Sequence, residues 1–274
     1  MKDFREELDK EEINKYYENA IGFVAKASKL VLDFYNSQDF TVELKSDVSP
    51  VTEADLASEK LLRNSILETY PEHGIIGEEY DPSNPSSDYQ WTIDPIDGTQ
   101  NFAAGIPTFG IMLSLRFKNK PIVGIIDHPA LKQNYSAAYS FGTKLNGKAI
   151  KIKDCNATKI EPNHIIATST TGMFKRTNEQ DLMLNFIKSH DSNRMYMDCW
   201  GHSLTACGSI DAMAEFNVRI WDASPTELLI TEAGGAFRYV RNLPSTKPEE
   251  YTDFLSAIFG KPSVVALLEK HFNS

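Results

Sequence analysis

The segment that most limits how this chain can fold is GEEYDPSNPSSDYQWTIDPIDGTQNF, residues 77–102. It carries six acidic side chains and no Lys or Arg, in a chain whose formal net charge is already -10. Like charges repel by roughly 4 kcal/mol per pair at 4 Å when the effective dielectric constant is about 20. Because residues 91–93 (WTI) read as a buried strand, these acids flank the core. A stable fold must therefore supply a positive charge to them.

Length and charge set the outer limits. At 274 residues the chain can bury a large core as one domain or as two closely packed halves. A pI near 5.1 argues against nonspecific binding to nucleic acid or to anionic membranes, since both require a basic face. The N-terminal MKDFREELDKEE is too charged for a signal peptide, and no apolar run is long enough to span a bilayer. Three cysteines without CxxC spacing read as reduced thiols, so we expect a cytoplasmic enzyme with no membrane or nucleic-acid partner.

Local patterns predict a mixed α and β chain. Apolar residues recur at a helical period from Ile13, and Thr52 with Asp55 forms a capping-box pattern before a second helix. Asn146-Gly147 between two short alternating runs indicates a hairpin. Ser224 is the expected N-cap of a late helix that stops at Gly234. Further strands are predicted at 91–93, 111–117, 122–126, 135–139, 164–169 and 212–218, and further helices at 178–189 and 203–209.

The acidic residues fall where elements begin or end. Asp94 ends the strand of residues 91–93, Asp97 follows within one turn, and Gly98 opens a short predicted helix whose free N–H groups attract an anion. Glu78 lies shortly upstream of this turn, and Asp222 far downstream. Ligand sets made only of oxygen select Mg²⁺, Mn²⁺ or Ca²⁺ over zinc, and the chain lacks an EF-hand loop. The sequence therefore predicts a magnesium site, with Mn²⁺ as a possible substitute.

A phosphate monoester is the ligand that fits such a site. Bare carboxylates repel it, whereas bound divalent cations reverse the local field, accept phosphate oxygens and activate a water. Two metals about 3.5–4 Å apart can hold the attacking and the leaving oxygen together. We therefore expect hydrolysis of a small phosphorylated metabolite.

Four ordered motifs carry a family resemblance. They are SPVTEAD (49–55), GEE (77–79), WTIDPIDGTQNF (91–102) and WDASPTELLITEAGG (221–235). Together they resemble the inositol-monophosphatase superfamily of Mg²⁺-dependent, lithium-sensitive phosphatases. The resemblance implies an α+β fold, a layered αβαβα sandwich, commonly assembled as a homodimer. The chain is then a single domain, 1–274, with an N-terminal metal-binding half of about 1–150 and a C-terminal half of about 151–274.

The resemblance also implies roles for individual residues around two or three Mg²⁺ ions. The expected metal ligands are Glu78, Asp94, Asp97, Asp222 and the carbonyl of Ile96. Backbone amides of Gly98 and Thr99 are expected to hold the phosphate, and Thr99 with Glu78 to orient the attacking water. Asp55 is expected to hold the Thr99 hydroxyl. Lys45 resembles a family lysine, although the chain is one residue shorter before Asp55, and Glu79 has either a supporting or a purely structural role.

Several segments resemble the histidinol-phosphate phosphatases of inositol-monophosphatase type, among them HGIIGEEY, PIVGIIDHPAL, STTGMF and DCW. Alignment back from Asp222 places Glu215 at a substrate-facing acid and Asp198 where inositol enzymes have a small residue. A second uncompensated carboxylate suits a substrate with a primary ammonium. We therefore expect L-histidinol phosphate as the substrate, contacted by Asp97, Asp198, Glu215 and Asp222.

Alternatives remain at this stage. An inositol phosphate is the main alternative substrate, followed by fructose bisphosphate or a 3′-phosphonucleotide, and a non-catalytic metal-binding regulator is a last possibility. Asp198 read alone is a surface acid, and Asp55 a capping residue. We expect His128 and the other histidines to be structural. Cys199 has no visible basic partner, so we do not expect a covalent mechanism.

Overall fold

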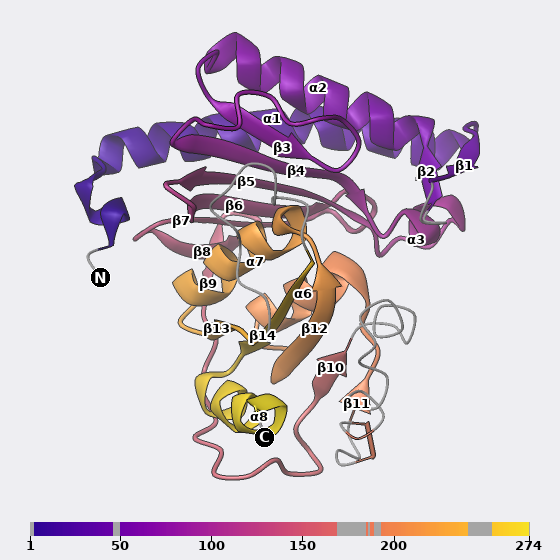
Figure 1. Ribbon diagram of the computed structural model, residues 1–274. Coiled ribbons are helices and arrows are strands. Elements are labelled where there is room, and N and C mark those ends of the chain that lie inside the picture. Colours follow the sequence, from indigo (N-terminus) through magenta and orange to yellow (C-terminus); the bar gives the residue numbers. More distant parts are fainter. Residues whose placement is uncertain are drawn as a thin grey trace.

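The computed structural model describes residues 3–45, 50–168, 185, 187–188, 193–240 and 254–273. Figure 1 shows these residues arranged in five layers: two long helices, a seven-stranded sheet, an inner pair of helices, a five-stranded sheet and a C-terminal helix. This is the expected αβαβα sandwich, and the fold prediction is confirmed.

The first layer consists of α1 (Lys10–Ser37) and α2 (Glu53–Thr69). Asp9 caps α1 by accepting a hydrogen bond of 3.0 Å from the Glu11 N–H. The apolar stripe predicted from Ile13 faces the large sheet, with Ala20, Ala27 and Val31 fully buried. The capping box predicted for α2 is also present. The Thr52 side chain accepts from a backbone N–H of the first turn, and the Asp55 carboxylate accepts from the Thr52 N–H.

The large sheet has the strand order β3-β4-β5-β6-β7-β8-β9, with β3 and β4 parallel and the other neighbours antiparallel. Helices cover both of its faces, which explains why β5 reads as a continuous apolar run. The predicted hairpin is confirmed, because Asn146 and Gly147 join β8 to β9 with φ of 49° and 77°. The strands are β3 (Gly74–Gly77), β4 (Tyr89–Asp97), β5 (Gly110–Phe117), β6 (Lys120–His128), β7 (Gln133–Ala138), β8 (Gly142–Leu145) and β9 (Lys148–Ile150).

The second half builds the remaining layers. Its sheet has the order β11-β10-β12-β14-β13, and the inner helices α6 and α7 lie between the two sheets (Figure 1). The helix predicted at 178–189 falls almost entirely outside the described residues, as does the STTGMF segment. The elements are β10 (Ile166–Thr168), β11 (Asn193–Arg194), α6 (Asp198–Ala206), β12 (Ala212–Val218), α7 (Ile220–Glu232), β13 (Ala236–Tyr239), β14 (Leu255–Gly260) and α8 (Pro262–Asn273).

Short elements complete the described chain. An antiparallel pair, β1 (Val42–Leu44) and β2 (Pro50–Thr52), leads into α2, and α3 (Thr99–Ala103) follows β4. Two 3-10 helices, η1 (Phe4–Glu7) and η2 (Pro129–Leu131), lie at the N-terminus and after β6. None of the helices in the described part of the chain is long and apolar enough to cross a membrane.

Two helix starts differ from the predictions. Helix α7 begins at Ile220, four residues before the expected N-cap Ser224, because the Asp222 carboxylate accepts from the Arg219 N–H and caps the helix earlier. Ser224 instead points at the large sheet, where its hydroxyl lies 2.9 Å from that of Ser114. Helix α6 likewise begins at Asp198 and not at Ser203. The predicted end of α7 is right, since Gly234 takes a φ of 87° directly after it.

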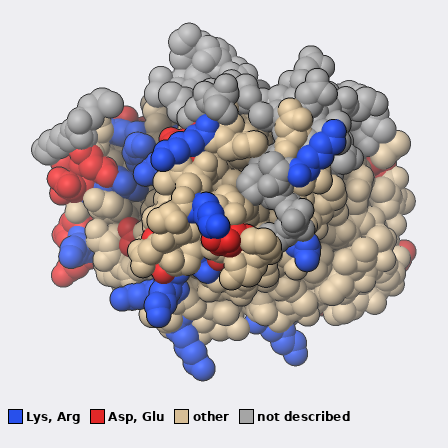
Figure 2. All heavy atoms as spheres, turned by 90° about the horizontal axis from the view of Figure 1, so that it is seen from below, with Lys and Arg blue, Asp and Glu red and all other residues tan. Residues whose placement is uncertain are grey.

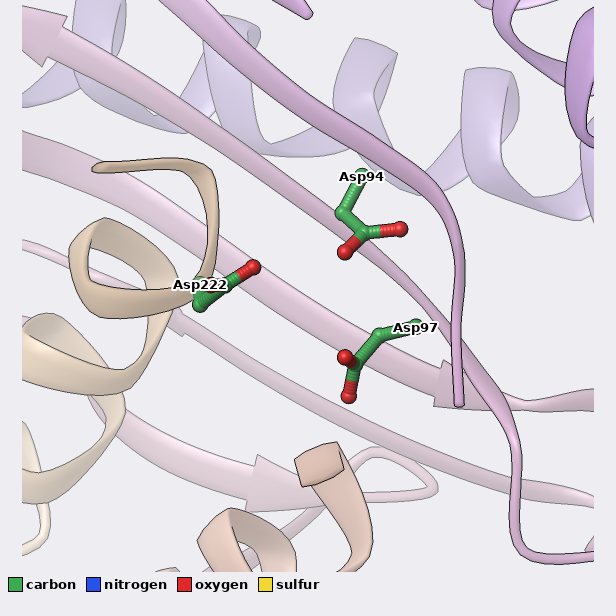
Figure 3. A group of neighbouring side chains, drawn as sticks. All are labelled: Asp94, Asp97 and Asp222. Carbon is green, nitrogen blue, oxygen red and sulfur yellow. The ribbon is translucent and has the colours of Figure 1, made fainter. Parts of the chain in front are cut away.

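Figure 2 shows the face seen from below, where the second sheet and α8 lie. Lys and Arg side chains stand at several separate places on this face, and a group of Asp and Glu lies at one side. Asp94 and Asp97 belong to another part of the molecule, at the end of β4 that faces the start of α7 (Figure 3).

Candidate metal centre and active site

Three aspartates converge between the large sheet and α7. Asp94 and Asp97 come from the end of β4, and Asp222 comes from the first turn of α7 (Figure 3). One carboxylate oxygen from each lies within 4.8 Å of the others. Residues that are far apart in the sequence therefore form one oxygen-rich cluster of the kind that could hold a metal ion.

A bulge in β4 makes this convergence possible. The register against β5 shifts between Asp94 and Asp97, so both side chains reach the same side of the sheet edge. The strand thus continues through Pro95 to Asp97, whereas the sequence predicted that it would end at Asp94. The bulge is consistent with Pro95, because proline cannot donate a hydrogen bond to a regular ladder.

Backbone N–H groups fix one oxygen of each aspartate. Asp94 Oδ1 accepts from the Ile96 N–H at 3.1 Å, Asp222 Oδ2 accepts from the Arg219 N–H at 2.8 Å, and Asp97 Oδ2 accepts from the Cys199 N–H. The second oxygen of each carboxylate has no such bond from a described residue. The carboxylates are therefore oriented in advance, with an oxygen to spare for a ligand.

The electrostatics of the cluster favour a bound cation. Burial, followed by the negative charge of Glu78, raises the pKa of Asp94 well above its usual value. Burial also raises the pKa of Asp97 to about 7, with Asp222 as the next cause, and the pKa of Asp222 to about 7. Because the donors are oxygens only, a hard divalent cation fits this cluster, and its charge would remove the repulsion.

Glu78 and Glu79 follow β3 at the edge of the cluster. The Lys45 ammonium lies 2.7 Å from Glu78 Oε1 and 2.6 Å from Glu79 Oε1. Lys45 therefore lies beside both acids, although its match to the family lysine is the weaker one. The Glu79 N–H also donates a 2.7 Å hydrogen bond to Glu59 Oε2. Burial, followed by the charge of Glu78, raises the pKa of Glu79 to about 7. Beyond burial, the negative charge of Glu78 helps to raise the pKa values of Asp94 and Asp222, while its carboxylate contacts Lys45.

The turn after β4 carries Thr99 and Gly98. The Thr99 hydroxyl lies 3.2 Å from Asp55 Oδ1 and 3.0 Å from the Ile96 carbonyl oxygen. The expected contact between Thr99 and Asp55 is therefore present. Gly98 precedes α3 with a φ of 82°, a conformation that favours glycine. Asp55 is buried at 1% exposure, and that burial raises its pKa to about 6. The capping box and the contact with Thr99 therefore use different oxygens of one carboxylate.

Asp198 lies on the other side of this turn, at the start of α6. Its Oδ2 lies 3.3 Å from the Asn101 side-chain amide and 3.2 Å from the position of a Cβ added at Gly98. Burial, followed by the charge of Asp97, raises the pKa of Asp198 to about 8. The reading of Asp198 as a plain surface acid is wrong, because the side chain is partly buried against the predicted phosphate-binding turn.

Glu215 on β12 has a partner that the sequence reading missed. Its Oε2 contacts His202 Nε2 across the layer between α6 and β12, and both side chains are buried. Glu215 thus has a buried imidazole as its partner, whereas the acid expected to be uncompensated was Asp198. His202 follows Asp198 by four residues, so helical spacing predicts that they share a face. The sequence carried no signal that β12 would bring Glu215 to that face.

Two other side chains near the cluster agree with the sequence reading. His128 lies 2.9 Å from the Phe109 carbonyl oxygen through Nδ1 and 2.8 Å from Ser203 Oγ through Nε2, which is a structural arrangement. Cys199 is fully buried, and burial followed by the charge of Asp97 raises the pKa of its thiol well above the usual value. A thiol in that environment is a poor nucleophile.

Comparison with known proteins places this geometry in a family. The model of the Inositol monophosphatase family matches residues 12–251. A histidinol-phosphatase of Chlorobaculum parvum is 31% identical over 225 residues, which are 79% of this chain and 82% of the relative. The chloroplastic bifunctional phosphatase IMPL2 of Arabidopsis thaliana is 34% identical over 84% of this chain and 65% of its own length. Relatives named inositol monophosphatase and Nus factor SuhB also match.

Solved structures give the same answer for the fold. An IMPase of Thermotoga maritima superposes with a TM-score of 0.79, over 94% of this chain and 97% of its own, at 22% identity. The matched region contains all of the residues assembled above, from Lys45 to Asp222. This chain belongs to the inositol monophosphatase family.

Proposed function

We propose that this protein is a Mg²⁺-dependent phosphatase that hydrolyses L-histidinol phosphate to L-histidinol. Membership of the family makes it a phosphatase that acts on small phosphorylated substrates. The observation that carries the dependence on a cation is the convergence of Asp94, Asp97 and Asp222, whose pKa values are all raised. Acids in that state bind a divalent cation at neutral pH with a gain in electrostatic energy.

The metal would be held by Asp94, Asp97 and Asp222, together with the Ile96 carbonyl and Glu78. Two or three Mg²⁺ ions fit this number of oxygens, and Mn²⁺ is chemically able to replace them. When bound, the ions supply Lewis acidity and lower the pKa of a coordinated water. Lys45, which forms an ion pair with both Glu78 and Glu79 in this structure, must share them with the cation.

The other residues of the turn bind and orient. Asp55 holds the Thr99 hydroxyl, and Thr99 with Glu78 then orients the attacking water. The backbone N–H groups of Gly98 and Thr99 lie at the start of α3, where no side chain of a described residue caps the helix, and they bind phosphate oxygens. Holding these groups in place in advance lowers the entropy cost of reaching the transition state.

The choice of substrate depends on Asp198. Its carboxylate lies beside the phosphate-binding turn, with the Asn101 amide as its side-chain partner among the residues that the structure describes, so it can receive a charge-assisted hydrogen bond from the ammonium of histidinol phosphate. Glu215 lies close enough for its charge to act on both Asp198 and Asp222. The relatives called histidinol-phosphatase support the same choice. An inositol phosphate is the second candidate, supported by the relatives that carry that name.

Phosphate release from a panel of esters tests the proposal. The panel contains histidinol phosphate, inositol 1-phosphate, fructose 1,6-bisphosphate and a 3′-phosphonucleotide, each with Mg²⁺ and with EDTA. We expect the highest kcat/KM for histidinol phosphate and no turnover in EDTA. A preference for inositol 1-phosphate would replace the proposed substrate, and no turnover of any ester would favour a non-catalytic regulator.

Asp198→Asn tests the recognition of the ammonium. A comparison substrate, N-acetylhistidinol phosphate, keeps the phosphate and the imidazole but carries a neutral amide in place of the ammonium. We expect the variant to lose about 10- to 100-fold in kcat/KM for histidinol phosphate and to change little for the acetylated ester, since hydrogen bonds to charged groups contribute about 1.5–3 kcal/mol. An equal loss for both substrates would contradict this role of Asp198.

The family resemblance adds two expectations for the whole protein, a homodimer and inhibition by lithium. A cytoplasmic location is the expectation from the cysteine pattern. Light scattering on the purified protein tests the first, and lithium titration of the Mg²⁺-activated enzyme tests the second.

A further inference from the structure

His202 is a buried histidine with an acceptor on each side of its ring. It lies on α6 at 3% exposure, with Nε2 in contact with Glu215 Oε2 and Nδ1 2.7 Å from Thr226 Oγ1. Glu215 belongs to β12 and Thr226 to α7, so the ring connects three elements behind the metal cluster.

The direction of each hydrogen bond follows from the chemistry of the partners. The Thr226 hydroxyl has one proton, which it donates to the Asp222 carbonyl oxygen at 2.8 Å. Its oxygen must therefore accept from His202 Nδ1–H. An ionised carboxylate only accepts, so Glu215 takes the second hydrogen bond from Nε2–H. A ring that donates from both nitrogens is an imidazolium.

The charges around the ring agree with that state. Burial lowers the pKa of His202, but Glu215 outweighs it, with Asp97 and Asp222 adding to the effect, and the pKa rises to about 9. The positive charge of His202 also attracts the Asp198 carboxylate at the start of α6, and burial, followed by that charge, lowers the pKa of the nearby His128 on β6. A metal would neutralise Asp97 and Asp222, whereas the contact with Glu215 remains.

We propose that His202 is a positioning residue that holds Glu215 as a buried ion pair and matches its charge, so that Asp198 alone supplies the unmatched carboxylate that recognises a cationic substrate. The Glu215 carboxylate is held through Oε2, so Oε1 takes no part in this contact. This inference rests on the proposed function for the identity of the substrate. The charge of His202 and its contact with Glu215 do not depend on it.

Magnetic resonance of labelled histidine tests the charge directly. The protein is prepared with ¹⁵N-histidine and saturating Mg²⁺ and is measured near pH 8, where exposed histidines are neutral. We expect one ring with both nitrogens protonated, absent from His202→Gln and converted to a neutral ring in Glu215→Gln. A wild-type spectrum in which every ring is neutral would overturn the proposal, whatever the enzyme hydrolyses.

Kinetics test the consequence for recognition. The readout is the ratio of kcat/KM for histidinol phosphate to that for N-acetylhistidinol phosphate. The double variant His202→Gln/Glu215→Gln removes both charges of the ion pair and leaves the net charge unchanged, so its ratio should stay within about 3-fold of wild type. Asp198→Asn should lower the ratio by about 10- to 100-fold. A double variant that loses the ratio as Asp198→Asn does would show that Glu215 itself recognises the ammonium and would overturn the proposal.

The two experiments separate the possible failures. Circular dichroism of each variant checks that it is folded. If the double variant does not fold, the magnetic resonance spectrum of the wild-type protein still decides the charge of His202. Absence of turnover of histidinol phosphate, together with a protonated His202, would refute the proposed substrate and leave the ion pair standing.

Discussion

Replacing Asp94 with Asn separates a metal ligand from a structural acid. Asn has nearly the same shape, and its Oδ1 can still accept the 3.1 Å hydrogen bond from the Ile96 N–H. The substitution therefore removes one negative charge and leaves the local geometry in place. Because burial and then Glu78 raise the pKa of Asp94, ionisation of this group opposes folding when no metal is bound.

The magnitude follows from the spacing of the cluster. At 4.8 Å, which the distances between these three oxygens do not exceed, two unit charges repel by about 3 kcal/mol when the effective dielectric constant is about 20. The penalty is absent below the unfolded pKa of an aspartate and grows as the pH rises through the raised folded pKa. Asp94→Asn should thus leave the melting temperature in EDTA near pH 8 unchanged or higher.

The same arithmetic predicts the loss of metal binding. A divalent ion carries twice the charge and binds a carboxylate oxygen at about 2.1 Å, so its attraction to Asp94 exceeds the repulsion between two acids. A loss of about 3 kcal/mol already weakens binding by roughly 100-fold. We expect Mg²⁺ affinity, measured by calorimetry, and kcat/KM, measured by phosphate release, to fall by at least this factor.

Two results would refute the reasoning. Unchanged turnover at low Mg²⁺ would show that Asp94 does not bind the catalytic metal. A melting temperature in EDTA several degrees below wild type would show that Asp94 stabilises the fold instead. Asp88→Asn, which removes a charge outside this cluster, is the control for the general effect of one charge.

Three further predictions follow from single contacts. Thr99→Val should lower kcat by roughly 100-fold while Thr99→Ser keeps most of it, measured at saturating substrate, because only Ser retains the hydroxyl. Lys45→Met should lower the melting temperature in EDTA and enlarge the increase on adding Mg²⁺, since Lys45 lies 2.7 Å and 2.6 Å from two acids that then repel; an unchanged Mg²⁺ response would contradict this. Burial lowers the pKa of His73, which accepts a 3.1 Å hydrogen bond from Trp91 Nε1, to about 4. Its stabilisation is present above pH 6.5 and is lost between pH 6.5 and 4, by at most about 1.4 kcal/mol per pH unit in urea unfolding, and His73→Gln should remove that dependence.

The sequence predicted what depends on short-range geometry. Thr52 and Asp55 form their capping box within one helical turn, and Asn146-Gly147 joins neighbouring strands, so a few residues contain all the information. The cluster of Asp94 and Asp97 is also local, since both lie on one turn of chain. Its pairing with Asp222 was predicted only through the resemblance to a family, because periodicity does not say which distant element packs against the end of β4.

Only the tertiary structure decided the contacts between elements. The start of α7 lies at Ile220 because the Asp222 carboxylate caps the Arg219 N–H, and Ser224 then packs against Ser114 of β5, a contact that no local pattern records. Glu215 was expected to face the substrate, and it also contacts His202 because β12 and α6 lie against each other. The sequence by itself determined the acids, the caps and the turns, whereas the charge that each acid finally carries depends on its neighbours in space. Burial and Coulomb interactions act over distances of a few ångströms and not over positions along the chain.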